Sequence, residues 1–213
     1  MWRIGLIDDK EGERADIQVS ILENVEYRNE IQFKEYEIVK KAKEKLFEEI
    51  IEDISEERIQ TLIVDYKLDT SQVVIKGWEI VDFVHEHVPE FPVIIMTNVP
   101  EESKESIYID ADKVYPKITF LNTKLPATEE MVKNILSNIQ KYVKRRKELE
   151  GSLAVELDKL DQNSTDEEII ANVLELEKSL SKYTETQQTV LDEALDMAEL
   201  KAVLQELKDI SQY

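Results

Sequence analysis

Short apolar runs alternate with helical segments through the first half of the chain, and this alternation constrains the fold most strongly. The runs, each typical of a β-strand, cover residues 4–7, 31–38, 61–64, 92–96 and 113–115. Between them, apolar residues recur with helical spacing in residues 11–25, 39–54, 78–88 and 101–109. Strands that alternate with helices form a parallel sheet, because a parallel pair needs a long crossover connection. We therefore predict an α/β fold with a doubly wound, five-stranded parallel sheet.

The chain is strongly acidic, with 47 Asp and Glu residues against 27 Lys and Arg residues and a formal net charge of −20. This charge disfavours nucleic acid as a partner, because phosphate-binding proteins need a basic face. The chain has no Cys, which excludes disulfides, thiolate metal sites and a cysteine nucleophile. No apolar stretch has the length of a signal sequence or a membrane span, so we expect a cytoplasmic protein without a membrane partner.

The composition changes near residue 124, beyond which Gly and Pro are almost absent. We predict two parts, a core of residues 1–124 and a helical segment of residues 125–213. A helix begins near Pro126, and its apolar positions follow the 3-4 spacing of an amphipathic helix. Arg146 and Glu156 interrupt the apolar face. This helix is expected to continue far past the edge of the core.

A second helix is predicted near residue 165, where Thr165 with Glu168, or Ser164 with Glu167, has the spacing of a capping box. An apolar stripe then repeats at coiled-coil spacing through residues 165–207. An isolated helix cannot bury such a stripe, so we expect an interaction surface. Its cover is the preceding helix folded back as a hairpin, a second copy of the chain or another protein, and the sequence leaves these alternatives open.

Acidic and other reactive side chains follow the apolar runs of the first half. The first run is followed by Asp8 and Asp9, the third by Asp65, the fourth by Thr97 and the fifth by Lys117. The carboxyl ends of parallel strands meet at one crevice, so these side chains should converge. Grouped carboxylates repel one another unless a cation lies among them, and their oxygens suit Mg²⁺. Such a group supports phosphoryl transfer to a carboxylate, with a hydroxyl and an ammonium holding the phosphoryl oxygens.

Residues 1–124 resemble the receiver domain of two-component response regulators. The motifs that carry the resemblance are Ile4-Gly5-Leu6-Ile7-Asp8-Asp9, Thr61-Leu62-Ile63-Val64-Asp65-Tyr66-Lys67-Leu68, Gly77-Trp78-Glu79-Ile80-Val81, Pro92-Val93-Ile94-Ile95-Met96-Thr97 and Ala111-Asp112-Lys113-Val114-Tyr115-Pro116-Lys117. The resemblance implies a flavodoxin-like sheet in which Asp65 is the phosphorylated aspartate. It also implies that Thr97 is the switch hydroxyl and that Lys117 pairs with the phosphate.

By the same resemblance, Asp9, Asp65 and the backbone carbonyl of Lys67 ligate Mg²⁺ directly, and Asp8 acts mainly through metal-bound water. The implied phosphodonor is a histidine kinase or another phosphorylated molecule. The output expected from the apolar stripe of the C-terminal helices is protein contact or dimerisation. We expect no enzyme activity apart from the receiver's own phosphorylation and dephosphorylation. Residues 125–213 contain no His, which excludes a helical phosphotransferase as the second part.

The chain departs from the family pattern at regulatory positions. The loop of residues 65–77 is longer than usual, Asn98 replaces a small residue, Pro116 precedes Lys117 instead of following it, and Val114 replaces the switch aromatic. These departures leave an alternative, a degenerate receiver that acts as a constitutive protein-interaction scaffold. A metal-dependent phosphatase on the same fold is a third interpretation, but it needs a separate general acid or substrate pocket that the sequence does not reveal.

Overall fold

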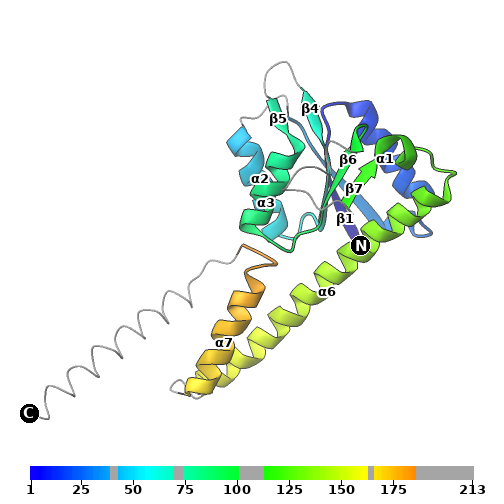
Figure 1. Ribbon diagram of the computed structural model, residues 1–213. Helices are drawn as coiled ribbons and strands as arrows, with labels where there is room; N and C mark the ends of the chain where they lie inside the picture. The colour runs from blue at the N-terminus through cyan, green and yellow to red at the C-terminus, as the bar shows by residue number, and fades with distance from the viewer. Residues whose placement is uncertain (39–42, 70–73, 101–112, 163–165, 186–213) are drawn as a thin grey trace, which may run out of the picture. The chain divides into compact units, whose positions relative to one another are not determined.

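The computed structural model describes residues 1–38, 43–69, 74–100, 113–162 and 166–185 (Figure 1). The chain forms two compact units. The sheet unit comprises residues 1–147 and 182–185, and the described part of the helical unit comprises residues 148–162 and 166–181. The helix predicted at residues 101–109 lies outside the described residues.

A five-stranded, wholly parallel sheet organises the sheet unit. Its strands are β1 (Trp2–Ile7), β2 (Ile31–Tyr36), β3 (Thr61–Asp65), β6 (Val93–Thr97) and β7 (Val114–Pro116). Their order in the sheet is β2-β1-β3-β6-β7, which is the flavodoxin-like order with its reversal beside β1. The predicted fold class, a doubly wound five-stranded parallel sheet followed by a helical segment, is confirmed.

Helices cover both faces of this sheet (Figure 1). They are α1 (Glu11–Glu23), α2 (Lys43–Ser55), α3 (Gly77–His87), the short α5 (Lys117–Phe120) and α6 (Pro126–Gln162), with a 3-10 turn at Arg28–Glu30. Residues of α2 and α3 pack with Leu62 and Val64 in one apolar cluster. Residues of α1 and α6 pack with Ile63 in a second cluster. Successive residues of β3 thus point into different cores, which explains why the central strands lack polar alternation.

The longer loop after Asp65 contains a hairpin that the sequence analysis missed. Strands β4 (Lys67–Asp69) and β5 (Val74–Lys76) pair antiparallel, and the tip at residues 70–73 lies outside the described residues. The hairpin is anchored by Leu68 and Ile75, whose exposed fractions are 2% and 1%. At its end, the Gly77 amide donates to the Tyr66 carbonyl at 3.0 Å. A Cβ on Gly77 would lie 2.4 Å from the Asp65 carbonyl oxygen, so only glycine fits there.

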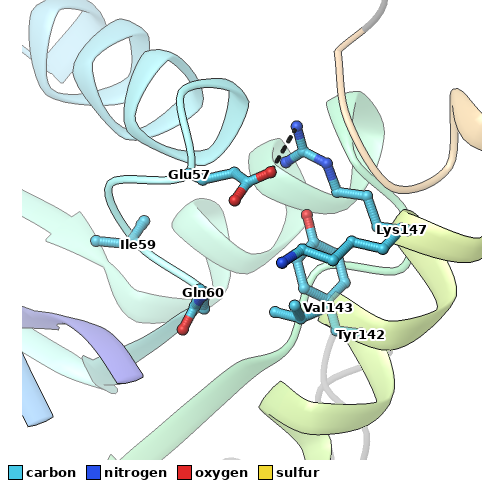
Figure 2. Close-up of a pocket in the computed structure, with 7 residues that line it drawn as sticks. Glu57, Ile59, Gln60, Tyr142, Val143 and Lys147 are labelled. Carbon is cyan, nitrogen blue, oxygen red and sulfur yellow. Dashed lines mark ion pairs between the residues drawn. The ribbon is translucent and has the colours of Figure 1, made fainter. Parts of the chain in front are cut away.

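The sequence suggested that Arg146 only interrupts the apolar face of α6, but the structure gives this side chain specific partners. Its side chain is buried, and its guanidinium donates to the carbonyls of Ile54 at 3.2 Å and Ser55 at 3.3 Å. These carbonyls belong to the C-terminal turn of α2, where a cation also stabilises the helix dipole. Figure 2 shows this region, with the ion pair between Arg146 and Glu57 at 3.6 Å as a dashed line. Arg146 thus fixes α6 against the end of α2.

In the helical unit, α7 (Glu167–Leu180) follows the end of α6. Its N-cap is Asp166, which accepts from the amides of Glu168 at 3.0 Å and Ile169 at 3.4 Å. The caps predicted from the sequence, Ser164 and Thr165, lie outside the described residues. The stripe predicted through residues 165–207 does not lie on a single helix, because α7 ends at Leu180 and residues 181–184 form a turn and a bend. The rest of that stripe, residues 186–213, lies outside the described residues.

None of the helices described has both the length and the apolar composition that crossing a membrane requires.

Candidate functional site

Three carboxylates meet at the carboxyl edge of the sheet. Asp8 and Asp9 directly follow β1, and Asp65 is the last residue of β3. The parallel register pairs Ile7 with Val64, so the two strands end side by side. One oxygen from each carboxylate lies within 4.8 Å of the others. We call these three residues the acidic cluster; Asp8 and Asp65 are buried, with exposed fractions of 1% and 8%.

Lys117 contacts the acidic cluster from the carboxyl end of β7, an edge strand of the sheet. It begins α5 directly after β7, and only 2% of its surface is exposed. Its ammonium lies 2.7 Å from Asp8 Oδ2 and 3.0 Å from Asp65 Oδ1, and it also donates to Glu13 Oε2. Burial alone would lower the pKa of Lys117, but its hydrogen bonds to Asp8 and Glu13 raise it above the ordinary value. Lys117 therefore remains charged at neutral pH.

Glu13 is a member of this site that the sequence analysis missed. It lies in the first turns of α1, and its second oxygen accepts from the Lys10 ammonium at 2.7 Å. Burial opposes its charge, but hydrogen bonds from Lys10 and Lys117 hold the pKa of Glu13 below its usual range. The signal for it is local, since the first turn of a helix that follows a strand lies close to the strand's carboxyl end.

Burial and neighbouring carboxylates disfavour the ionised forms of Asp9 and Asp65. Burial raises the pKa of Asp65 to about 6; the Lys117 ammonium opposes this rise, and Asp8 and Glu13 add to it. Burial and the neighbouring Asp8 raise the pKa of Asp9 as well. One ammonium is thus shared among several carboxylates whose full ionisation needs more positive charge.

The donor set of the acidic cluster fits a hard divalent cation such as Mg²⁺. Among the described residues, the buried Asp9 Oδ1 atom has no hydrogen-bond partner, and a buried polar atom without a partner is costly. Carboxylate and carbonyl oxygens are the ligands that Mg²⁺ prefers. Lys67, whose carbonyl was predicted as a further ligand, begins β4 two residues after Asp65. Asp8, Asp9 and Asp65 would hold the ion, and the Lys67 carbonyl stays a predicted further ligand.

Thr97 ends β6 at the same edge of the sheet. It is buried and stands opposite Pro116 in the register with β7, while Met96 stands opposite Asp65 in the register with β3. Its hydroxyl oxygen accepts from the Val99 amide at 3.0 Å. The structure thus places Thr97 one strand away from Asp65, with its hydroxyl bonded to the following loop.

The chain is similar to a solved response-regulator structure. No family model and no curated protein matches the chain. Among solved structures, a chain of the RcsB response regulator of Salmonella typhimurium, from a study of its conformational dynamism for DNA interaction, matches with 15% sequence identity and a TM-score of 0.43. The match covers 91% of this chain and 97% of that chain. The strand order and register of this chain itself identify its fold.

Proposed function

We propose that this chain is a phosphoaspartate signalling protein. Its sheet unit accepts a phosphoryl group on Asp65 with Mg²⁺ bound at the acidic cluster, and the phosphorylated state controls a helical output. The observation that carries the proposal is the convergence of Asp8, Asp9 and Asp65 within 4.8 Å, with the buried Lys117 ammonium 3.0 Å from Asp65 Oδ1. Phosphoryl transfer to a carboxylate needs this combination of nucleophile, cation ligands and fixed positive charge.

The residues of the site have distinct roles in the proposed reaction. A carboxylate oxygen of Asp65 attacks phosphorus, the bond from phosphorus to the donor's leaving atom breaks, and the electron pair leaves with the donor. With a pKa of about 6, Asp65 is mostly ionised at neutral pH and can act as the nucleophile. Lys117 donates to a phosphoryl oxygen and Thr97 is the switch hydroxyl. Bound Mg²⁺ neutralises charge on the phosphoryl oxygens. Attack by water on phosphorus later breaks the phosphorus–oxygen bond to Asp65, releases inorganic phosphate and restores the carboxylate.

The proposed partners follow from the two units. The donor is a histidine kinase or another phosphorylated molecule, and the output is a protein partner or a second copy of this chain bound through the C-terminal helices. Helix α6, with 37 residues, belongs to both units, which supports a role in coupling them. The net charge of −20 argues against nucleic acid as the partner. We propose no enzyme activity beyond the phosphorylation cycle of Asp65.

The proposal is tested by incubating the full chain with acetyl phosphate and Mg²⁺ and measuring its intact mass. We expect the mass of one added phosphoryl group, which Asp65→Asn should abolish because the nucleophile is gone. Asp82→Asn, a carboxylate on α3 outside the acidic cluster, is the matched control and should be phosphorylated like the parent. A parent that gains no mass would contradict the proposal and favour a constitutive scaffold. Equal phosphorylation of Asp65→Asn would contradict the assignment of Asp65.

A further inference from the structure

Glu13 is the carboxylate beside the acidic cluster to which the proposed reaction gives no role. We propose that Glu13 holds the Lys117 ammonium in the resting state and must release it before Lys117 can bond a phosphoryl group on Asp65. Glu13 is thus a positioning residue that sets how readily the site takes up a phosphoryl group. This inference rests on the proposed function and adds a competing carboxylate to it.

The first argument is the number of hydrogens that Lys117 can donate. A lysine ammonium has three, and three carboxylates already lie around it, from Asp8, Glu13 and Asp65. Only 2% of Lys117 is exposed, so the ammonium is bonded by protein groups and hardly by water. A phosphoryl oxygen can therefore gain a hydrogen bond from Lys117 only by displacing one of these carboxylates.

The second argument identifies the carboxylate that leaves. Asp8 is held at both oxygens, because Oδ1 accepts from the Lys10 amide at 2.9 Å and Oδ2 from Lys117. Asp65 is the group that carries the phosphoryl. The Glu13 side chain is 23% exposed, and its other oxygen is bonded to Lys10, whose own side chain is 62% exposed. Glu13 can therefore give up Lys117 and keep both an ion pair and water, which lowers the cost of its release.

The consequence is a direct competition for one ammonium between Glu13 and the phosphoryl group. Weakening the Glu13 contact should therefore strengthen binding of a phosphoryl mimic. Glu13→Gln removes the charge and weakens the hydrogen bond. Glu13→Asp keeps the charge, but its side chain is one methylene shorter and holds Lys117 poorly. If Glu13 competes through direct contact with Lys117, both variants should bind the phosphoryl mimic more tightly than the parent. If Glu13 acts through long-range charge, Glu13→Asp should bind the mimic like the parent.

The experiment measures the affinity of the full chain for beryllofluoride, a phosphoryl mimic, by calorimetry in the presence of Mg²⁺. We expect about tenfold tighter binding for Glu13→Gln, from the loss of a charge-assisted hydrogen bond, and a smaller gain for Glu13→Asp. Glu11→Gln is the matched control, because Glu11 is exposed in the same first turn of α1, and it should bind like the parent. Equal affinities of Glu13→Gln and the parent, or equal gains for Glu11→Gln and Glu13→Gln, would overturn the inference.

A second measurement needs neither metal nor mimic. The ammonium hydrogens of Lys117 can be followed by ¹⁵N NMR, and their exchange with water should be slow in the parent and several-fold faster in Glu13→Gln, since one of three hydrogen bonds weakens. An unchanged exchange rate would overturn the inference. If the parent bound beryllofluoride but Glu13→Gln changed neither readout, only this inference would fail. A parent without any affinity for beryllofluoride would overturn the proposed function and this inference together.

Discussion

Asp53 and Asp65 are both buried carboxylates of the sheet unit, yet their surroundings shift their pKa values in opposite directions. Burial would raise the pKa of each. Around Asp53, hydrogen bonds from Lys34, Tyr36 and Arg58 outweigh this effect and hold its pKa below the usual range. Around Asp65, burial prevails and raises the pKa to about 6, because the Lys117 ammonium is shared with other carboxylates.

The difference lies in the ratio of donors to acceptors. Asp53 is one fully buried acceptor, and its oxygens receive hydrogen bonds from the Tyr36 hydroxyl at 2.6 Å, from Arg58 and from Lys34. At the acidic cluster the ratio is reversed, because the residues that the structure describes there offer several carboxylates for one lysine. A buried carboxylate with enough hydrogen-bond and ion-pair partners stabilises the fold. One with too few partners destabilises the fold until a further cation binds. We infer that Asp53 serves structure and that Asp65 serves function.

The largest expected effect is the loss of stability on removing the charge of Asp53. Asp53→Asn leaves Lys34 and Arg58 without their shared buried partner, so we expect the free energy of unfolding to fall by about 3 kcal/mol. Urea denaturation at pH 7 measures it. Glu52→Gln is the control, because Glu52 pairs with the same Arg58 at 2.8 Å but its side chain is 62% exposed, and it should cost less than about 1 kcal/mol. Equal losses for the two variants would contradict the comparison.

Removing the charge of Asp65 should have the opposite sign. The pKa of Asp65 is raised to about 6 from its ordinary 3.8, so the folded state binds the proton more tightly than the unfolded chain does. This carboxylate therefore destabilises the metal-free fold above pH 6, and the penalty disappears as the pH falls towards 4. We expect Asp65→Asn to be more stable than the parent by up to about 3 kcal/mol at pH 7 in EDTA, and by almost nothing near pH 4.

Urea denaturation of both proteins between pH 4 and pH 8 checks this prediction. A variant less stable than the parent at pH 7, or a difference that does not change with pH, would show that Asp65 is satisfied in the resting fold.

Mg²⁺ should reduce the contrast between the two carboxylates by supplying the missing positive charge. At tenfold excess over its dissociation constant, a bound ion stabilises the parent by about 1.4 kcal/mol. Asp53→Asn should keep this gain, and Asp9→Ala should lose it because Asp9 is a proposed ligand. Thermal unfolding with Mg²⁺ and with EDTA measures the gain. Equal Mg²⁺ stabilisation of Asp9→Ala and the parent would place the ion elsewhere.

The smallest expected effect comes from Tyr36→Phe. This change removes one hydrogen bond to Asp53 and keeps the buried ring, while Lys34 and Arg58 remain in contact with the carboxylate. We expect a loss of about 1 kcal/mol and unchanged phosphorylation of Asp65. A loss as large as that of Asp53→Asn, measured by the same denaturation, would mean that Asp53 depends on the tyrosine alone.

The acidic cluster could be predicted from the sequence, whereas the Asp53 network could not. Parallel strands end at one edge, so Asp8, Asp9 and Asp65 were expected to meet from the apolar runs alone. The partners of Asp53 come from β2 and from the loop after α2, and no spacing rule relates these residues. The network forms only when α2 packs against β2, which is a tertiary effect.

Other differences between sequence and structure have similar causes. Arg146 was interpreted as a break in a helical stripe, because the carbonyls that it binds, those of Ile54 and Ser55, lie 92 and 91 residues away in the chain. The hairpin after Asp65 had a local signal in the β-branched residues 73–75, but each strand has only three residues, below the length at which alternation is informative. Helix α7 ends within a continuous stripe, so periodicity alone did not locate its end.

The central claim is that Asp65, and not another carboxylate, receives the phosphoryl group, and the most direct measurement identifies the modified residue. Borohydride reduces an aspartyl phosphate to homoserine, whose position peptide mass mapping reveals. After treatment of the full chain with acetyl phosphate and Mg²⁺, we predict homoserine at position 65 and unmodified aspartate at positions 8, 9 and 53. Homoserine at any of those three positions, or its absence from position 65, would contradict the account.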